Sequence, residues 1–223
     1  MFTYKKVIDL TRILQPGKER FALDIETFQV NELLPGFTKP EGEWYILQEW
    51  KISSHIGTHV ESPFHHIHEG ADISLLPITT LFGDAIMLDF RWKKGGESIE
   101  RDELILTASG RIHKNDLVII HTGCDIIYNI PNYNRPYLSL DAIRWLIEQQ
   151  ISCIGIDASG IEQYQAPEQP GHLLLFEHNI PVIEELTHLD CIESDRFVMF
   201  ALPIPIEGAD ACPIRAIAFE GVL

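Results

Sequence analysis

Between residues 55 and 66 the chain reads His55-Ile56-Gly57-Thr58-His59-Val60-Glu61-Ser62-Pro63-Phe64-His65-His66. On an α-helix, His55 and His59 would share a face, but the glycine, the β-branched residues and Pro63 disfavour a helix here. On an extended chain, side chains alternate between two faces, so His55, His59 and Glu61 would point the same way. We therefore predict an extended segment that presents two imidazoles and one carboxylate together.

This set of side chains is a candidate metal site. Two imidazoles and a carboxylate suit Zn²⁺, Mn²⁺ or Fe²⁺, which all accept mixed nitrogen and oxygen ligands. Gly57 would keep the backbone slim between the imidazoles, and Pro63 would turn the chain so that His65 stands across the site. A histidine there could act as a general acid or base, because the imidazole pKa lies near neutrality. A hydrogen-bonded structural cluster and an adventitious surface cluster are the alternatives.

The composition excludes several classes of protein. The 223 residues carry 17 Lys and Arg against 33 Asp and Glu, a formal net charge of −16. Such a charge repels nucleic-acid phosphates and anionic membrane surfaces, and no Lys/Arg cluster interrupts it. No apolar run is long enough to span a bilayer, and no export signal follows Met1. The four cysteines are scattered, so we expect reduced, mostly buried thiols and a cytoplasmic chain.

The periodicity of the sequence predicts an α/β fold in one domain that covers residues 1–223. Strands are expected at short apolar or β-branched runs, namely Lys6–Asp9, Gln48–Ser53, Ala85–Phe90, Leu117–His121, Cys153–Ile156 and Phe197–Leu202. Several of them are apolar on both faces, as in a sheet that is covered on two sides. Helices are expected at Glu100–Ala108, at Leu138–Gln150 and from His172 to Asn179.

Three smaller features have open interpretations. Trp44-Tyr45 and Trp50 could line a pocket, but packing in the core is the favoured interpretation. Cys124 could act as a nucleophile beside a histidine, although apolar packing explains it better. Asp157 could support a metal ligand or hold a structural turn.

The histidine segment resembles the signature H-x-G-T-H-x-D-x-P-x-H of the cyclase-like metal-dependent hydrolases, a family that includes kynurenine formamidases and isatin hydrolases. Six of the seven fixed positions match, because the chain has Glu61 where the family usually has Asp. The similarity continues in further segments, Val7–Thr11, Cys153–Ser159, His172 with Ile180–Leu186, and Ala209–Ala216. The resemblance therefore covers most of the chain.

The resemblance implies a swivelling β/β/α fold with a mixed sheet and flanking helices, assembled into homodimers or homotetramers. It implies six site residues: His55, His59 and Glu61 as ligands of a first metal, His172 and Glu184 as ligands of a second metal that Glu61 bridges, and His65 as the catalytic histidine. The expected cofactor is Zn²⁺, as one or two ions, with Mn²⁺ as the alternative.

Two departures from the family pattern bear on the function. Glu61 carries one methylene more than the usual Asp, which changes the reach of the carboxylate. The loop Gln15–Asp24 lacks the Trp-Pro-Gly-Asp typical of kynurenine formamidases, and only Phe21 stands near the Trp position. We expect a hydrolase that uses a metal-activated water to cleave a small amide, such as an N-formyl arylamine. A lactone or lactam hydrolase or cyclase and a non-catalytic metal-binding protein are the alternatives.

Overall fold

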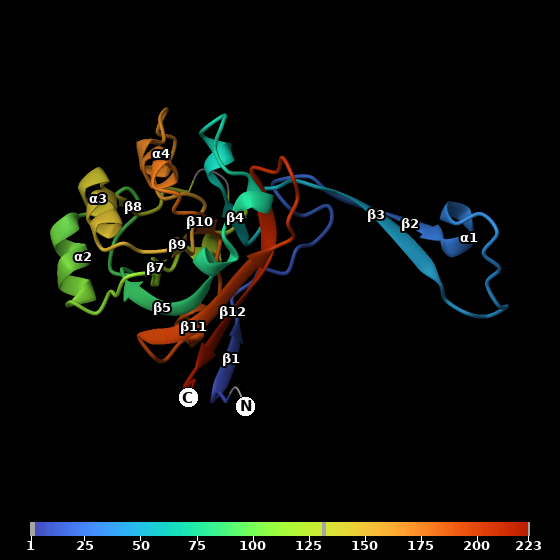
Figure 1. Cartoon of the computed structure of the whole chain (residues 1–223), viewed down its shortest axis with the longest axis horizontal. Coiled ribbons are helices and arrows are strands. Elements are labelled where there is room, and N and C mark those ends of the chain that lie inside the picture. Colours follow the sequence, from blue (N-terminus) through green and yellow to red (C-terminus); the bar gives the residue numbers. More distant parts are fainter. Residues whose placement is uncertain (1–2, 131–132, 223) are drawn as a thin grey trace.

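The computed structural model describes residues 3–130 and 133–222. Its central sheet contains β1 (Lys6–Asp9), β4 (His59–Glu61), β5 (Phe82–Asp89), β7 (Leu117–His121), β9 (Cys153–Ile156), β10 (Val182–Glu184), β11 (Arg196–Pro203) and β12 (Ala211–Glu220). These eight strands follow the order β1-β12-β11-β5-β7-β9-β10-β4 (Figure 1). Strand β12 also pairs with β4, so the sheet closes on itself into a barrel-like fold, with β1 as an edge strand.

The sheet is mixed. Strands β5, β7, β9 and β10 run parallel to their neighbours within this group. The remaining pairings are antiparallel, including those that hold β4 between β10 and β12. The predicted fold class, α/β with a mixed sheet and flanking helices, is confirmed.

Three helices flank the parallel part of the sheet (Figure 1). They are α2 (Arg101–Ala108), α3 (Leu140–Glu148) and α4 (Pro170–Glu177). Helix α3 begins where Ser139 accepts a hydrogen bond from the backbone N–H of Ala142, and it buries Ala142, Ile143 and Leu146. This apolar stripe is the one that the spacing in the sequence predicts for a helix facing the core.

Strand β7 shows why the parallel strands are apolar on both faces. Val118 and Ile120 belong to a core cluster that the three helices cover. Leu117 and Ile119, which alternate with them, belong to a second cluster enclosed by the barrel-like sheet. Because both faces are buried, an unbroken apolar run is favoured over an alternating one.

A hairpin arm extends away from this body (Figure 1). It consists of β2 (Leu23–Gln29), the short helix α1 (Val30–Leu33) and β3 (Ile46–Ile52), and within the described parts of the chain its two strands pair with each other alone. Trp44 is 74% exposed and Trp50 is 65% exposed. The prediction that these residues pack in the core is wrong, because the arm is a single layer that projects beyond the core.

The remaining regular elements of the described chain are short. They are β6 (Ser98–Ile99), β8 (Tyr137–Leu138) and the 3₁₀ turns Pro63–His65, Ile73–Leu75, Ile78–Thr80, Cys124–Ile127 and Leu189–Cys191. Three cysteines are buried, as expected, and Cys191 is exposed. Within residues 3–130 and 133–222, every helix is too short or too polar to cross a bilayer.

Candidate metal centre

Two of the predicted ligands lie on β4, and a third precedes it. Strand β4 begins at His59, so alternation places only His59 and Glu61 on a common face. His55 lies in the preceding turn, where Gly57 has a φ of +57° and a side chain would collide with Leu14. The prediction of an extended segment that starts at His55 is therefore wrong. The left-handed conformation of Gly57, rather than a slim strand, brings His55 to the site.

Glu61 directs its two carboxylate oxygens at different partners. Oε1 lies 2.8 Å from His55 Nδ1 and 3.4 Å from His59 Nε2. Oε2 lies 3.1 Å from His172 Nε2. The glutamate that replaces the usual aspartate therefore reaches both sets of partners.

His172 and Glu184 reach the same place from α4 and β10. His172 Nε2 lies 3.3 Å from Glu184 Oε1. Glu184 is the register partner of His59 across the β10–β4 pairing, and its Oε2 lies 3.8 Å from His59 Nε2. The structure thus brings the five predicted ligands into two trios, His55–His59–Glu61 and Glu61–His172–Glu184, each with ligand atoms within 4.8 Å of one another.

Hydrogen bonds behind the imidazoles orient two of these rings. His59 Nδ1 donates to the carbonyl of Gly57 at 2.8 Å, and His172 Nδ1 lies 2.6 Å from Glu162 Oε2. Glu162 also accepts the backbone N–H of His172 at 2.8 Å. When Nδ1 donates, Nε2 keeps the lone pair that a metal ion needs. Sequence reasoning missed Glu162, because no motif spacing connects it to the histidine.

Two buried polar atoms at the junction of the trios have no hydrogen-bond partner among the residues that the structure describes. They are Glu61 Oε2 and His172 Nε2, which lie at ion-pair distance but not in hydrogen-bond geometry. Their residues are only 4% and 3% exposed, and buried polar atoms are nearly always satisfied in folded proteins. A divalent cation would engage the lone pairs of both atoms, so the residues present fit a metal ion.

The electrostatics of the cluster agree with this fit. Burial disfavours the ionised carboxylate of Glu61, yet the imidazoles of His172, His55 and His59 hold its pKa well below its usual value. Burial likewise disfavours protonated His172, yet the surrounding carboxylates hold its pKa well above the usual value. The cluster therefore attracts positive charge, which a bound cation supplies in place of protons.

His65 stands beside the cluster in the 3₁₀ turn Pro63–His65, as predicted. Its Nδ1 lies 3.0 Å from Asp210 Oδ2, and its Nε2 lies 4.0 Å from Glu61 Oε1. Asp210 Oδ2 also lies 2.8 Å from His55 Nε2, and although burial opposes it, Glu61 and Asp210 raise the pKa of His55 to about 9. Sequence reasoning missed Asp210, which is 145 residues from His65. The family-like segment around it was the one available signal.

A cavity of about 470 Å³ opens onto the cluster. Its wall includes all five candidate ligands and His65. Arg20 and Phe21 line the same cavity, so the loop that departs from the family pattern does reach it. The site can therefore admit a small molecule that contacts the cluster directly.

Cys124 and Asp157 do not join the cluster, whereas His66 contacts it from outside. Burial raises the pKa of the Cys124 thiol to about 11, which disfavours the reactive thiolate. Asp157 accepts the backbone N–H groups of Thr122 and Gly123 and so holds a turn. His66 stacks against the ring of His172, with centroids 5.4 Å apart.

A sequence model of one protein family, described as putative cyclase, matches residues 8–163. The chain belongs to this cyclase family. Its relatives include a kynurenine formamidase of Erythrobacter litoralis, 23% identical over 97% of this chain and 94% of the relative. A kynurenine formamidase of Bacillus cereus (strain ATCC 10987) is 29% identical over 74% of this chain and 76% of the relative.

Solved structures of similar proteins share the cyclase-family fold over almost the whole chain. A potential metal-dependent hydrolase with cyclase activity is 26% identical, with a TM-score of 0.76 over 96% of this chain and 98% of the other. Isatin hydrolase A from Ralstonia solanacearum has a TM-score of 0.82 over 96% of this chain and 92% of the other, at 21% identity. The second likeness concerns the fold alone.

Proposed function

We propose that this chain is a metal-dependent hydrolase that cleaves a small amide of the N-formyl arylamine type. The observation that carries the proposal is the carboxylate of Glu61, whose two oxygens face two His/Glu trios that are buried except for the half-buried His55. The relatives named kynurenine formamidase support an amide as the substrate. Hydrolysis or formation of a lactone or lactam on the same site is the alternative.

Zn²⁺ is the proposed metal, with Mn²⁺ as the alternative, because both accept imidazole and carboxylate ligands. His55, His59 and Glu61 would hold one ion, and Glu61, His172 and Glu184 would hold a second. When bound, the metal supplies a water of lowered pKa and polarises the carbonyl of the substrate.

His65 is proposed as the proton carrier of the reaction. Asp210 holds Nδ1 of the ring, so that Nε2 faces the cavity on the side of Glu61. Nε2 takes a proton from the attacking water and returns it to the leaving nitrogen as the C–N bond breaks. Asp210 stabilises the imidazolium that exists between these two transfers.

Purified protein reconstituted with Zn²⁺ or Mn²⁺ is expected to hydrolyse formanilide faster than lactones or cyclic amides of similar size. Release of aniline measures the reaction, and elemental analysis of the same sample gives the metal bound per chain. Turnover of lactones or lactams alone would support the alternative substrate class. If the metal-loaded protein cleaves none of these compounds, the hydrolase proposal fails and a non-catalytic metal-binding protein remains.

We also propose a homodimer or homotetramer in which the hairpin arm contacts a second copy of the chain. The exposed Trp44 and Trp50 lie on an arm whose two strands pair with each other. Two-stranded hairpins are marginally stable alone, and exposed apolar groups mark contact surfaces. A second copy suits this surface because a two-fold contact covers both arms at once. Light scattering should detect an oligomer of the wild-type protein, and the double variant Trp44→Ser/Trp50→Ser should dissociate more readily. A monomeric wild-type protein would contradict the proposed assembly.

The cytoplasm is the proposed compartment. All four cysteines are free thiols, which suits a reducing environment. Fractionation of cells that places the chain in an oxidising compartment would contradict this proposal.

A further inference from the structure

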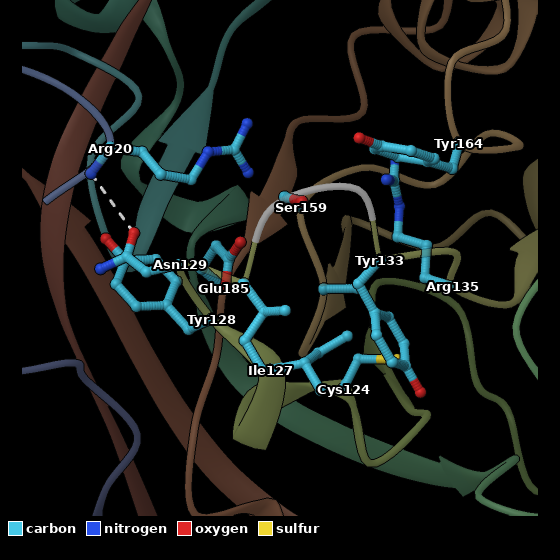
Figure 2. A pocket seen from close by; sticks show the side chains of 12 residues that line it. Arg20, Cys124, Ile127, Tyr128, Asn129, Tyr133, Arg135, Ser159, Tyr164 and Glu185 are labelled. Atoms are coloured by element: carbon cyan, nitrogen blue, oxygen red, sulfur yellow. Dashed lines mark hydrogen bonds between the residues drawn. The ribbon is translucent and has the colours of Figure 1, made fainter.

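Two cavities beside the candidate metal centre have lining residues in common. The second, drawn in Figure 2, has a volume of about 220 Å³, and six of its lining residues also line the cavity that opens onto the ligand trios. The shared wall consists of Arg20, Tyr128, Arg135, Ser159, Tyr164 and Glu185. A substrate with its scissile bond at the trios can therefore place another group in the second cavity.

Two guanidinium groups border this shared space. Figure 2 shows Arg20 and Arg135 on opposite sides of the pocket, with Ser159 between them. Arg135 is half-buried, its Nε donates to the carbonyl of Gly160 at 2.9 Å, and its guanidinium carbon lies 5.7 Å from the centre of the Tyr164 ring. A Cβ at Gly160 would collide with Arg135, so this glycine makes room for the guanidinium.

The acidic groups near Arg135 have other partners. Glu185 Oε2 lies 3.5 Å from the Nε of Arg12. The other two acids that act on Arg135 are Glu184 and Glu162, which belong to the candidate metal centre. Glu162 Oε2 lies 2.6 Å from Nδ1 of His172, and Glu184 Oε1 lies 3.3 Å from Nε2 of the same ring. Among residues 3–130 and 133–222, no carboxylate forms an ion pair with Arg135 or Arg20. Glu185 attracts Arg20 at longer range, but neither guanidinium lies within ion-pair distance of a described carboxylate, so both can pair with an anion from outside the chain.

We propose that Arg135 and Arg20 bind a carboxylate of the substrate, which makes the substrate a small amide that carries a carboxylate away from the scissile bond. The planar fork of an arginine matches a carboxylate, and a charge-assisted pair is stronger than a neutral one. Because the chain carries a net charge of −16, an anion needs local cations to be held here. Ile127 and Ile130 line the same cavity and suit an apolar or aromatic body. This inference rests on the proposed hydrolase function.

A matched pair of substrates tests the inference. Formanilide is neutral, and 4-formamidobenzoate is the same amide with a carboxylate on the ring. In the metal-loaded protein, Arg135→Met is expected to lower the ratio of kcat/KM for the anionic over the neutral substrate about 10- to 100-fold, mainly through KM, because a charge-assisted contact is lost. Arg135→Lys should keep the ratio closer to the wild-type value than Arg135→Met does. Arg20 lies on an exposed loop, so Arg20→Met should lower the ratio less than Arg135→Met does.

The control is Arg144→Met, which removes an exposed arginine paired with Asp141 at 2.7 Å and should leave the ratio unchanged. Melting temperatures establish that each variant is folded, and the Arg20 variant keeps the test open if Arg135→Met unfolds. An unchanged ratio in both folded variants would overturn the carboxylate site.

Calorimetry with 4-aminobenzoate and neutral 4-aminobenzamide separates this inference from the proposed function. Tighter binding of the anion that depends on Arg135 supports the carboxylate site, even if neither amide is hydrolysed and the hydrolase proposal fails. Equal binding of the two compounds to the wild-type protein overturns the site, even if both amides are hydrolysed.

Discussion

Replacing Glu61 with glutamine is expected to release metal from both trios of the candidate centre. The two side chains have the same shape, but the amide has a single oxygen and no negative charge, so it cannot serve as the shared ligand that the distances from Oε1 and Oε2 indicate. Loss of outer contacts alone weakens metal sites 10- to 100-fold, so loss of this carboxylate should lower Zn²⁺ affinity by at least about 100-fold. Competition with a chromophoric chelator measures the affinity, and elemental analysis measures the content.

Two further variants make this experiment specific. Glu193→Gln makes the same chemical change at an exposed glutamate paired with Lys6 at 2.7 Å, and it should leave the metal content unchanged. Glu61→Asp installs the residue usual in the family and is expected to retain metal. Circular dichroism of the metal-free proteins separates loss of ligand from loss of fold. Full metal content in Glu61→Gln would refute the shared-carboxylate arrangement.

His65→Ala is expected to leave the metal bound and to lower kcat about 10²- to 10⁴-fold, the usual contribution of a general acid or base. The physical reason is the position of the ring, which is held by Asp210 at 3.0 Å and stands 4.0 Å from Glu61. Elemental analysis matters here because His55, His65 and Asp210 form a third group with ligand-like geometry. A fall in metal content along with kcat would identify His65 as a ligand instead of a proton carrier.

The matched control is His68→Ala, since the side chain of His68 is 93% exposed and pairs with its neighbour Glu69. Partial recovery of His65→Ala activity by added imidazole would be the signature of a missing proton carrier. Undiminished turnover by a purified, folded His65→Ala protein would remove this histidine from the mechanism.

The part of the site that is local in sequence could be predicted from spacing. His59 and Glu61 share a face because strand alternation requires it, and the structure places both on β4. The turn that carries His55 could not be predicted in the same way. It depends on the positive φ of Gly57 and on the close approach of Leu14, which is a tertiary contact. The extended pattern therefore predicted the correct side chains with the wrong backbone path for one of them.

The residues that tertiary packing brings to the site could be predicted only through the family resemblance, and some of them were not predicted at all. His172 and Glu184 are brought to β4 by helix α4 and strand β10, and no periodicity connects them to the histidine segment. Glu162 and Asp210 were missed because their roles appear only as contacts with distant rings. The same limit applies to the arm, where apolar composition predicted burial for tryptophans that the fold leaves exposed.

The closure of the sheet sets the order in which the centre can be completed during synthesis. Glu61 on β4 pairs with Ala211 on β12, which follows it by 211 − 61 = 150 residues. Until the ribosome has delivered that strand, β4 lacks one of its two neighbours and Asp210 has not yet reached His55 and His65. Pairings across such long separations form late, because the entropy of closing the loop must be overcome first. A metal ion that needs the finished geometry could therefore bind only after β12 has been synthesised and paired with β4, although His55, His59 and Glu61 are made much earlier.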